Sequence, residues 1–320
     1  MQTYSITIKP ESAFGTPVSG DTFFGQLCWA VRNTYGEQRL QELLESYTNN
    51  KPFAIVSDAF PADFIPMPLI PGCKFKPVDE RQRKQMKKRI WFPLQEINQP
   101  VHEWQQHGRT DEHMTDGKGQ WKKTSIQPHN SIDRLTGTTG KTGFAPYTTQ
   151  QIWYHSSVNL QCYILLDESR LDANELNTLI TEIGLFGYGR DASIGLGKFT
   201  IKSFEKINLP EQTNANCCLT LSACAPQGLG YDSTQSYYQL MTRFGRHGDL
   251  AVHQKGKPFK NPVLLAKAGS VFKTKTAKAQ WVGQGLGANG QLSKTIENTV
   301  QQGYAPVINL HLAESQESIQ

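Results

Sequence analysis

The sequence predicts an α+β protein built from two ferredoxin-like (RRM-type) halves, residues 1–205 and 206–320, with a glycine-rich loop and an insertion in the first half. The chain opens with the periodicity of a strand, a helix and a strand, which is typical of ferredoxin-like units. A further strand and helix follow a long polar stretch without periodicity, so that stretch is predicted to be an insertion. With 320 residues, the chain can bury the core of one large or two medium domains.

The first elements follow from hydrophobic periodicity. Residues 3–9 alternate apolar and polar side chains, which predicts a strand. Ser19 is a suitable helix N-cap, and apolar residues then recur at three and four positions until Gly36, which predicts a helix. A second helix is predicted at 37–47 and a strand at 53–56. The aromatic side chains of these elements are expected in the core.

The predicted insertion covers residues 73 to about 150, and we expect it to be partly looped or to carry a hairpin. Alternating apolar residues at 152–166 then predict one half-buried strand. A helix is predicted at 172–186 and a strand at 199–204, on either side of the glycine-rich loop. In the second half, strands are predicted at 217–223 and 306–312, and a short helix at 234–241.

The glycine-rich loop reads GLFGYGRDASIGLGKF over residues 184–199. Glycine tolerates positive φ and has no Cβ, so successive N–H groups in such a loop can turn toward a phosphate. Tight turns that join packed elements are the alternative interpretation. The predicted phosphate-binding residues here are Gly187, Gly189, Arg190, Ser193, Gly195, Gly197 and Lys198.

Positive charge is segregated along the chain, although the net charge is only +5. Residues 250–296 hold eight lysines and no acidic residue, and residues 81–89 hold six more cations. The rest of the chain is therefore acidic, and the two basic stretches fit a polyanion-binding surface. A solvated basic face would give the same pattern.

The basic stretch of the second half is interleaved with Phe244, Phe259 and Trp281. Cations together with aromatic rings suit single-stranded RNA, because the cations neutralise phosphates and the rings stack on bases. The predicted RNA-binding residues of this half are Arg243, Arg246, Lys255, Lys257, Lys260, Lys273 and Lys275. In the insertion, His129, Asn130 and Arg134 are the candidates for RNA contact, with a loop-bracing role as the alternative.

Several stretches resemble one known family. The motif G-x-G-R-x-x-S-x-G-x-G-K-F between a helix and a strand is similar to the glycine-rich loop of the RAMP superfamily of CRISPR RNA-binding proteins. The match narrows to the family of the fourth Csm subunit of type III-A effector complexes. It rests on four stretches in order: residues 19–31 (SGDTFFGQLCWAV) with 57–61 (SDAFP) and 66–68 (PMP), residues 129–137 (HNSIDRLTG), the glycine loop, and residues 267–272 (KAGSVF).

The resemblance implies a non-catalytic cap subunit of a CRISPR ribonucleoprotein in antiviral defence. Such a subunit grips the repeat-derived 5′ handle of the guide RNA and meets the target RNA only indirectly. Its implied protein partners are the large polymerase and nuclease subunit and the first backbone RAMP subunit. Insertions in such proteins form thumb-like projections that press against the guide RNA. The related Cmr-type cap protein is the nearest alternative, and the SDAFP stretch favours the Csm form.

No catalytic, metal or cofactor site is expected from the motifs. Residues 137–142 end like a phosphate-binding Walker A loop, but Leu135 stands where its first glycine should be. The histidines at 102, 107 and 113 and the cysteines at 217, 218 and 224 match no usual zinc spacing. The rival function is a RAMP endoribonuclease that processes CRISPR precursor RNA. No histidine precedes His102, which leaves Lys9 and Tyr35 as conceivable acid and base groups.

The cysteines and the N-terminus indicate the compartment. Six scattered cysteines without a short disulfide-dense pattern fit a reducing cytoplasm. The start MQTYSITIKP lacks the features of a signal peptide, and the chain has no apolar run of about 18 residues. We therefore expect a soluble cytoplasmic protein without a membrane partner.

Overall fold

The computed structural model describes residues 1–140, 143–248, 258–273 and 278–313. Its first half contains a five-stranded antiparallel sheet with the order β2-β8-β1-β9, to which β3 adds by pairing with β8. Along the chain these elements follow one another as a strand, two helices, three strands, a helix and a strand, with the insertion between β3 and β8. The bounds are β1 (Gln2–Pro10), α1 (Gly20–Tyr35), α2 (Glu37–Leu44), β2 (Ala54–Val56), β3 (Phe60–Pro61), β8 (Leu160–Leu166), α5 (Ala173–Phe186) and β9 (Phe199–Ile207).

The local sequence explains where the two long helices begin and end. Asp172 caps α5 by accepting the Glu175 N–H at 2.8 Å, and the Glu175 carboxylate accepts the Asp172 N–H in return. Gly187 ends α5 with a φ of +110°, and Gly36 ends α1 with a φ of +94°. Both helices turn apolar faces to the sheet, and a core of buried side chains from α1, α5, β1 and β8 lies between them. The helices and strands predicted in the first half are thereby confirmed, with shifted ends, except for the strand predicted at 152–166.

The second half is a four-stranded antiparallel sheet with the order β13-β10-β17-β14. No helix occurs in its described residues. The short helix predicted at 234–241 is wrong, because Tyr237 forms a β-bridge with Val271 and a strand begins at Leu240. Two small ribbons complete this half. The bounds are β10 (Cys217–Thr220), β11 (Leu240–Arg243), β12 (Val263–Ala266), β13 (Val271–Phe272), β14 (Trp281–Gly283), β15 (Leu286–Gly287), β16 (Val300–Gln301) and β17 (Tyr304–Leu310).

The two halves share buried contacts. The Gln302 side chain bonds to the edge of β2, where it accepts the Val56 N–H at 2.8 Å and donates to the Val56 carbonyl at 2.7 Å. Tyr163 of β8 packs in a cluster with side chains of β10 and β17. β8 is therefore buried on both faces, whereas the alternating sequence had predicted a half-buried strand.

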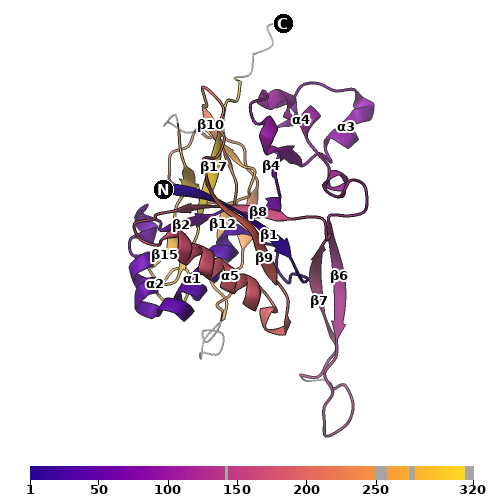
Figure 1. Cartoon of the computed structure of the whole chain (residues 1–320), viewed down its shortest axis with the longest axis vertical. Coiled ribbons are helices and arrows are strands. Elements are labelled where there is room, and N and C mark those ends of the chain that lie inside the picture. The colour runs from indigo at the N-terminus through magenta and orange to yellow at the C-terminus, as the bar shows by residue number, and fades with distance from the viewer. Residues whose placement is uncertain (141–142, 249–257, 274–277, 314–320) are drawn as a thin grey trace.

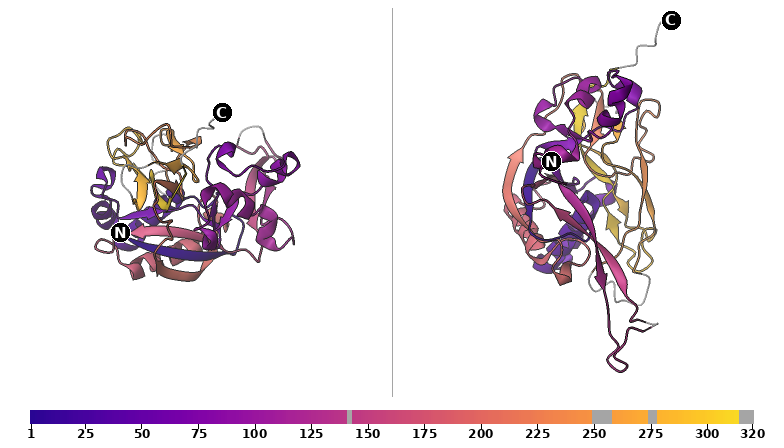
Figure 2. Two further views of the ribbon diagram at one scale, coloured as in Figure 1. Left: turned by 90° about the horizontal axis from the view of Figure 1, so that it is seen from above. Right: turned by 90° about the vertical axis from the view of Figure 1, so that its right-hand side faces the viewer.

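The insertion is larger than the sequence predicted. The predicted single strand at 152–166 is in fact two strands, β7 and β8, separated by residues 155–159. A compact unit packs beside the second half, and a long hairpin of β6 and β7 projects from the body (Figure 1; Figure 2 shows it from two further sides). The bounds are β4 (Phe64–Pro66), α3 (Glu80–Met86), β5 (Trp91–Pro93), α4 (Trp104–His107), β6 (Lys122–His129) and β7 (Tyr147–Tyr154). Short 3-10 turns lie at Tyr47–Asn49, Gly72–Lys74, Leu94–Glu96, Val101–Glu103, Asp111–Thr115 and Ala192–Ile194.

Candidate RNA-binding surface

The glycine loop folds tightly on itself between α5 and β9. A Cβ on Gly187 would lie 2.4 Å from the Leu196 carbonyl oxygen, and one on Gly197 would lie 2.1 Å from the Tyr188 carbonyl oxygen. Both glycines also have positive φ, at +110° and +74°. The absence of a Cβ at both positions therefore allows the backbone to pack closely. Both glycines are buried.

Most backbone amides of the loop already have acceptors within the protein. The Tyr188 N–H donates to the Gly197 carbonyl at 2.9 Å, and the Gly197 N–H donates to the Ala13 carbonyl at 2.7 Å. The Lys198 N–H donates to Ser12 Oγ at 2.9 Å. In the described loop, the amides without such an acceptor belong to Gly189, Asp191, Ala192 and Ser193. A phosphate would therefore meet the 189–193 part of the loop, and Gly195 would only shape it.

The charged side chains of the loop differ in their contacts. The Arg190 guanidinium donates to the Gln150 carbonyl at 2.6 Å and lies 3.3 Å from the Asp191 carboxylate. Because Gln150 lies in the middle of β7, opposite Ile126 of β6, Arg190 braces the projecting hairpin. Ser193 and Lys198 are exposed. Lys198 is therefore the loop cation whose charge is available to a ligand.

A hollow of about 230 Å³ joins the glycine loop to α1 and to the second half. Phe186 at the end of α5 is 77% exposed, and Arg32 lies 5.0 Å above the ring of Trp29. These flat side chains can stack on a base. The residues around the hollow are Gln26, Trp29, Ala30, Asn33, Glu182, Ile183, Phe186, Gly187 and Gly248.

The sequence prediction missed both aromatic residues of this hollow. It placed Trp29 in the core with the other aromatic residues of the opening helix, and it gave Phe186 no role. A signal was present for Trp29, which lies outside the buried stripe of α1 formed by Phe23, Phe24, Leu27 and Val31. For Phe186 the periodicity of α5 gave no such signal.

Two predicted cations of the second half lie against α1. Arg243 is paired with the buried carboxylate of Asp21, at 2.6 Å from Nε and 2.9 Å from Nη2. Burial lowers the pKa of Lys260, which lies close to Cys28 and Asp21. Arg243 therefore holds the halves together in addition to any role toward RNA.

Arg246 has the most open position of these cations. It is exposed, and its guanidinium lies 5.8 Å above the ring of Phe259. Phe244 and Phe259 are 71% and 61% exposed. This part of the ribbon thus presents a cation and two aromatic rings to solvent, beside the hollow.

Other predicted residues lie elsewhere. Lys273 bonds to Gln235 and lies at the opposite end of the ribbon from Arg246, because Tyr237 pairs with Val271 and Arg243 pairs with Val263. Asn130 and Arg134 are exposed beyond the last pair of the β6–β7 hairpin. His129 bonds to Thr149 at 2.9 Å and stacks on Tyr147. Lys255, Lys257 and Lys275 lie outside the described residues.

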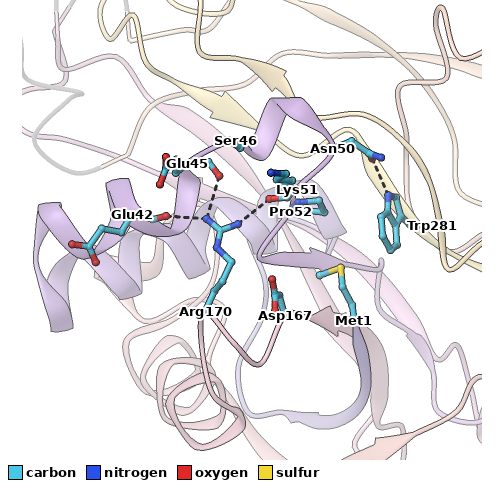
Figure 3. Close-up of a pocket in the computed structure, with 10 residues that line it drawn as sticks. All are labelled: Met1, Glu42, Glu45, Ser46, Asn50, Lys51, Pro52, Asp167, Arg170 and Trp281. Carbon is cyan, nitrogen blue, oxygen red and sulfur yellow. Dashed lines mark hydrogen bonds between the residues drawn. The ribbon is translucent and has the colours of Figure 1, made fainter.

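A second hollow, of about 470 Å³, lies at the end of α2 (Figure 3). Its arginine, Arg170, donates to the backbone carbonyls of Glu42, Leu43, Glu45 and Lys51. Three carboxylates line it, those of Glu42, Glu45 and Asp167. This hollow is therefore less suited to a phosphate than the first one.

The described residues contain no group of three or more metal-ligating side chains that could hold a metal ion. None of the helices in the described ranges is long and apolar enough to cross a membrane. Burial, with Glu175, Glu182 and Asp172 nearby, raises the pKa of Tyr35. This direction weakens Tyr35 as a general base near neutral pH.

One comparison with known proteins identifies a family. The model of the RAMP superfamily matches residues 11–200. No curated protein matches the sequence. Among solved structures, the chain is similar to Csm4 in the crystal structure of the Csm1–Csm4 cassette in complex with cA4, with a TM-score of 0.62 and 14% identity over 98% of this chain and all of that one. For the Csm1–Csm4 cassette in complex with pppApA, the TM-score is 0.61 and the identity 13%, at the same coverage of both chains.

A third similar structure is the Csm3–Csm4 subcomplex of the type III-A CRISPR-Cas interference complex. The TM-score is 0.59 and the identity 15%, over 97% of this chain and all of that one. At such identities the likeness shows a shared fold, which is mixed α and β with antiparallel sheets.

Proposed function

The chain belongs to the RAMP superfamily, and from this premise we propose that it is the RNA-binding cap subunit of a type III-A CRISPR complex. In this role it grips the repeat-derived 5′ handle of the guide RNA and acts in the cytoplasm. The fold shared with Csm4 over nearly the whole chain supports the assignment. The sequence prediction reached the same family from the glycine loop.

One observation carries the RNA-binding part of the proposal. The hollow between α1, α5 and Gly248 brings two aromatic rings, the half-buried ring of Trp29 and the exposed ring of Phe186, next to the glycine loop with Lys198 and next to the ribbon with Arg246. A single strand needs cations for its phosphates and flat surfaces for its bases, and this surface offers both.

The proposed protein partners are the large polymerase and nuclease subunit and a backbone RAMP subunit. The similar Csm4 chains are found with Csm1 and with Csm3, which supports this choice. We also propose that both halves are ferredoxin-like. The sheet order β2-β8-β1-β9 with two crossing helices supports this for the first half. In the second half only the antiparallel sheet supports it.

We propose a structural role without catalysis. The raised pKa of Tyr35 favours this over the endoribonuclease alternative. Incubation with repeat RNA in EDTA tests it, and a discrete cleavage product would favour the nuclease.

The experiment that tests RNA binding compares 5′-handle RNA with a scrambled RNA of equal length by fluorescence anisotropy, over a salt series. We expect tighter handle binding by the wild type, and a loss of about tenfold for Phe186→Ala combined with Lys198→Glu. Lys202→Glu is the matched control, because Lys202 is exposed on β9 outside the surface. Unchanged affinity of the double variant would remove this surface from the site.

A further inference from the structure

The insertion contains a second cationic site, distant from the glycine loop. Residues 72–89 hold eight cations and two acidic residues. Their helix, α3, lies at the other end of the molecule from the tip of the β6–β7 hairpin and away from α5 (Figure 1). A strand bound at the glycine loop does not need this site.

The unit that carries α3 is firmly held, so its charge is not that of a mobile loop. Phe92 stacks on Trp104 with ring centroids 3.9 Å apart. The Gln212 side chain, from the second half, donates to the carbonyls of Ile97 at 2.6 Å and Gln99 at 2.8 Å. Asp79 caps α3 by accepting the Arg81 N–H at 2.9 Å.

A cleft of about 530 Å³ opens between α3, the 72–78 segment and Gln105 of α4. Arg83, Met86 and Lys87 are spaced by three and four residues, so they share the face of α3 that lines the cleft. Val78 also lines the cleft, as does Phe75, which is 9% exposed and otherwise packs in the core. The cleft thus combines apolar side chains with three cations, of which Lys76 is paired with Glu103 at 3.2 Å. Its volume lies in the range of small-molecule sites.

Few acidic groups neutralise these cations. Arg83 has an i,i+3 partner in Glu80 at 3.8 Å, between side chains that are 64% and 86% exposed, and such surface pairs are weak. In the described part of the chain, the side chains of Arg81, Lys84, Lys87 and Lys88 have no protein acceptor. Arg81, Lys84 and Lys88 follow the adjacent face of α3 and extend the charge beyond the cleft.

We propose that this cleft binds one nucleotide, with its base against Phe75 and Met86 and its phosphate between Arg83 and Lys87. Phosphate recognition by paired cations and stacking on flat or apolar side chains are the usual elements of nucleotide binding by single-strand readers. The nucleotide is either free or part of an RNA strand, whose neighbouring phosphates would then follow Arg81, Lys84 and Lys88.

Cys73 provides a reporter inside the cleft. All six cysteines lie in the described part of the chain, and Cys73 is the exposed one. Cys28 is partly buried, and burial raises the pKa of its thiol to about 12, so it reacts slowly with alkylating agents. Mass spectrometry of the Cys73 peptide after timed iodoacetamide treatment therefore reads occupancy of this cleft alone.

The full-length protein is labelled without ligand and with AMP, pyrophosphate or a 20-nucleotide RNA that lacks the handle. We expect saturating AMP or RNA to slow Cys73 alkylation at least fivefold. In the double variant Arg83→Glu with Lys87→Glu, the alkylation rates with and without ligand should be equal. Lys202→Glu is the control and should keep the protection. Protection by AMP and RNA indicates that a free nucleotide is accepted, and protection by RNA alone indicates a nucleotide within a strand.

Three results would overturn the proposal. The first is that neither AMP nor RNA protects Cys73, and the second is that the double variant is protected as strongly as the wild type. The third is that pyrophosphate, which has no base to stack, protects Cys73 as strongly as AMP or RNA does. The test is independent of the proposed handle site. Phe186→Ala with Lys198→Glu should lose handle binding and keep AMP protection at Cys73, so failure of one site is distinguished from failure of the other.

Discussion

At the scale of single residues, Asp58 is a carboxyl whose pKa differs from its ordinary value. Burial raises the pKa of this carboxyl to about 7, against the opposing effect of the Gly20 N–H that it accepts at 2.8 Å. Nearby Asp21 raises the pKa further and Arg243 lowers it. Asp58 belongs to the SDAFP stretch, so this stretch has a structural role at the start of α1.

The first prediction concerns pH. Because the folded state binds a proton that the unfolded chain releases near its ordinary pKa, the contribution of Asp58 to the free energy of unfolding should fall as pH rises from about 4 to about 7. Asp58→Asn keeps an oxygen for the Gly20 N–H and removes the titration. The free energy of unfolding is measured with urea for both proteins. The value of the variant minus that of the wild type should rise by on the order of 1 kcal/mol from pH 5 to pH 8. A pH-independent difference would contradict this.

Arg170 carries the second prediction. Its guanidinium donates to the carbonyls of Glu42, Leu43 and Glu45 at the end of α2, and to that of Lys51 (Figure 3). Arg170→Ala leaves these acceptors to water, and we expect a loss of about 2 kcal/mol in urea unfolding. The stability of Arg170→Lys should lie between that of the wild type and that of Arg170→Ala, because an ammonium cannot span the same set of carbonyls. An unchanged midpoint for Arg170→Ala would show that water replaces the arginine.

At the scale of elements, the glycine loop packs like a turn although it resembles a phosphate cradle in sequence. A test compares two of its glycines, both with positive φ, at +74° for Gly197 and +96° for Gly195. A Cβ on Gly197 would lie 2.1 Å from the Tyr188 carbonyl oxygen, whereas one on Gly195 would meet no atom within 4 Å. Both substitutions by alanine pay about 1 kcal/mol for the backbone conformation.

The third prediction is that Gly197→Ala costs clearly more, above about 3 kcal/mol, because the backbone must also move. Thermal unfolding of the two variants measures the difference. Equal melting temperatures would mean that the contact between Gly197 and Tyr188 is not essential.

The elements that periodicity and caps define could be predicted from the sequence, and these are β1, α1, α5 and β9. The division of 152–166 into β7 and β8 could not, because the apolar alternation continues from Ile152 of the hairpin stem into β8. Residues 234–241 were predicted helical on local spacing, but the pairing of Tyr237 with Val271 prevails. Such pairing depends on residues distant in sequence, and local patterns do not contain it.

At the scale of the whole molecule, charge counting indicated the basic stretches but not which cations are available. Arg190 braces the hairpin, Arg243 pairs with Asp21, and Lys198 and Arg246 are exposed. Of the aromatic partners, Trp29 comes from a helix whose aromatic residues were expected in the core, and Phe186 ends a helix for which no aromatic role was predicted. The surface therefore depends on how the halves meet, which no local pattern encodes.

The last prediction tests how the halves meet. Arg243 on β11 of the second half pairs with Asp21 on α1 of the first, and the Asp21 side chain is 4% exposed. Arg243→Ala leaves that carboxylate buried without its cation, and we expect a loss of about 3 kcal/mol in urea unfolding. Adding Asp21→Asn removes the unpaired charge and should recover part of the loss, whereas Arg246→Ala should leave stability nearly unchanged.

RNA binding by the same variants separates the two roles of Arg243. If Arg243 acts mainly by holding the halves, the double variant with Asp21→Asn should bind handle RNA nearly as well as the wild type at temperatures where both are folded. Arg246→Ala, whose guanidinium lies over Phe259 in the open, should bind it more weakly and with a smaller salt dependence. The reverse order of affinities would place the RNA at Arg243 and move the binding surface inward, toward the start of α1.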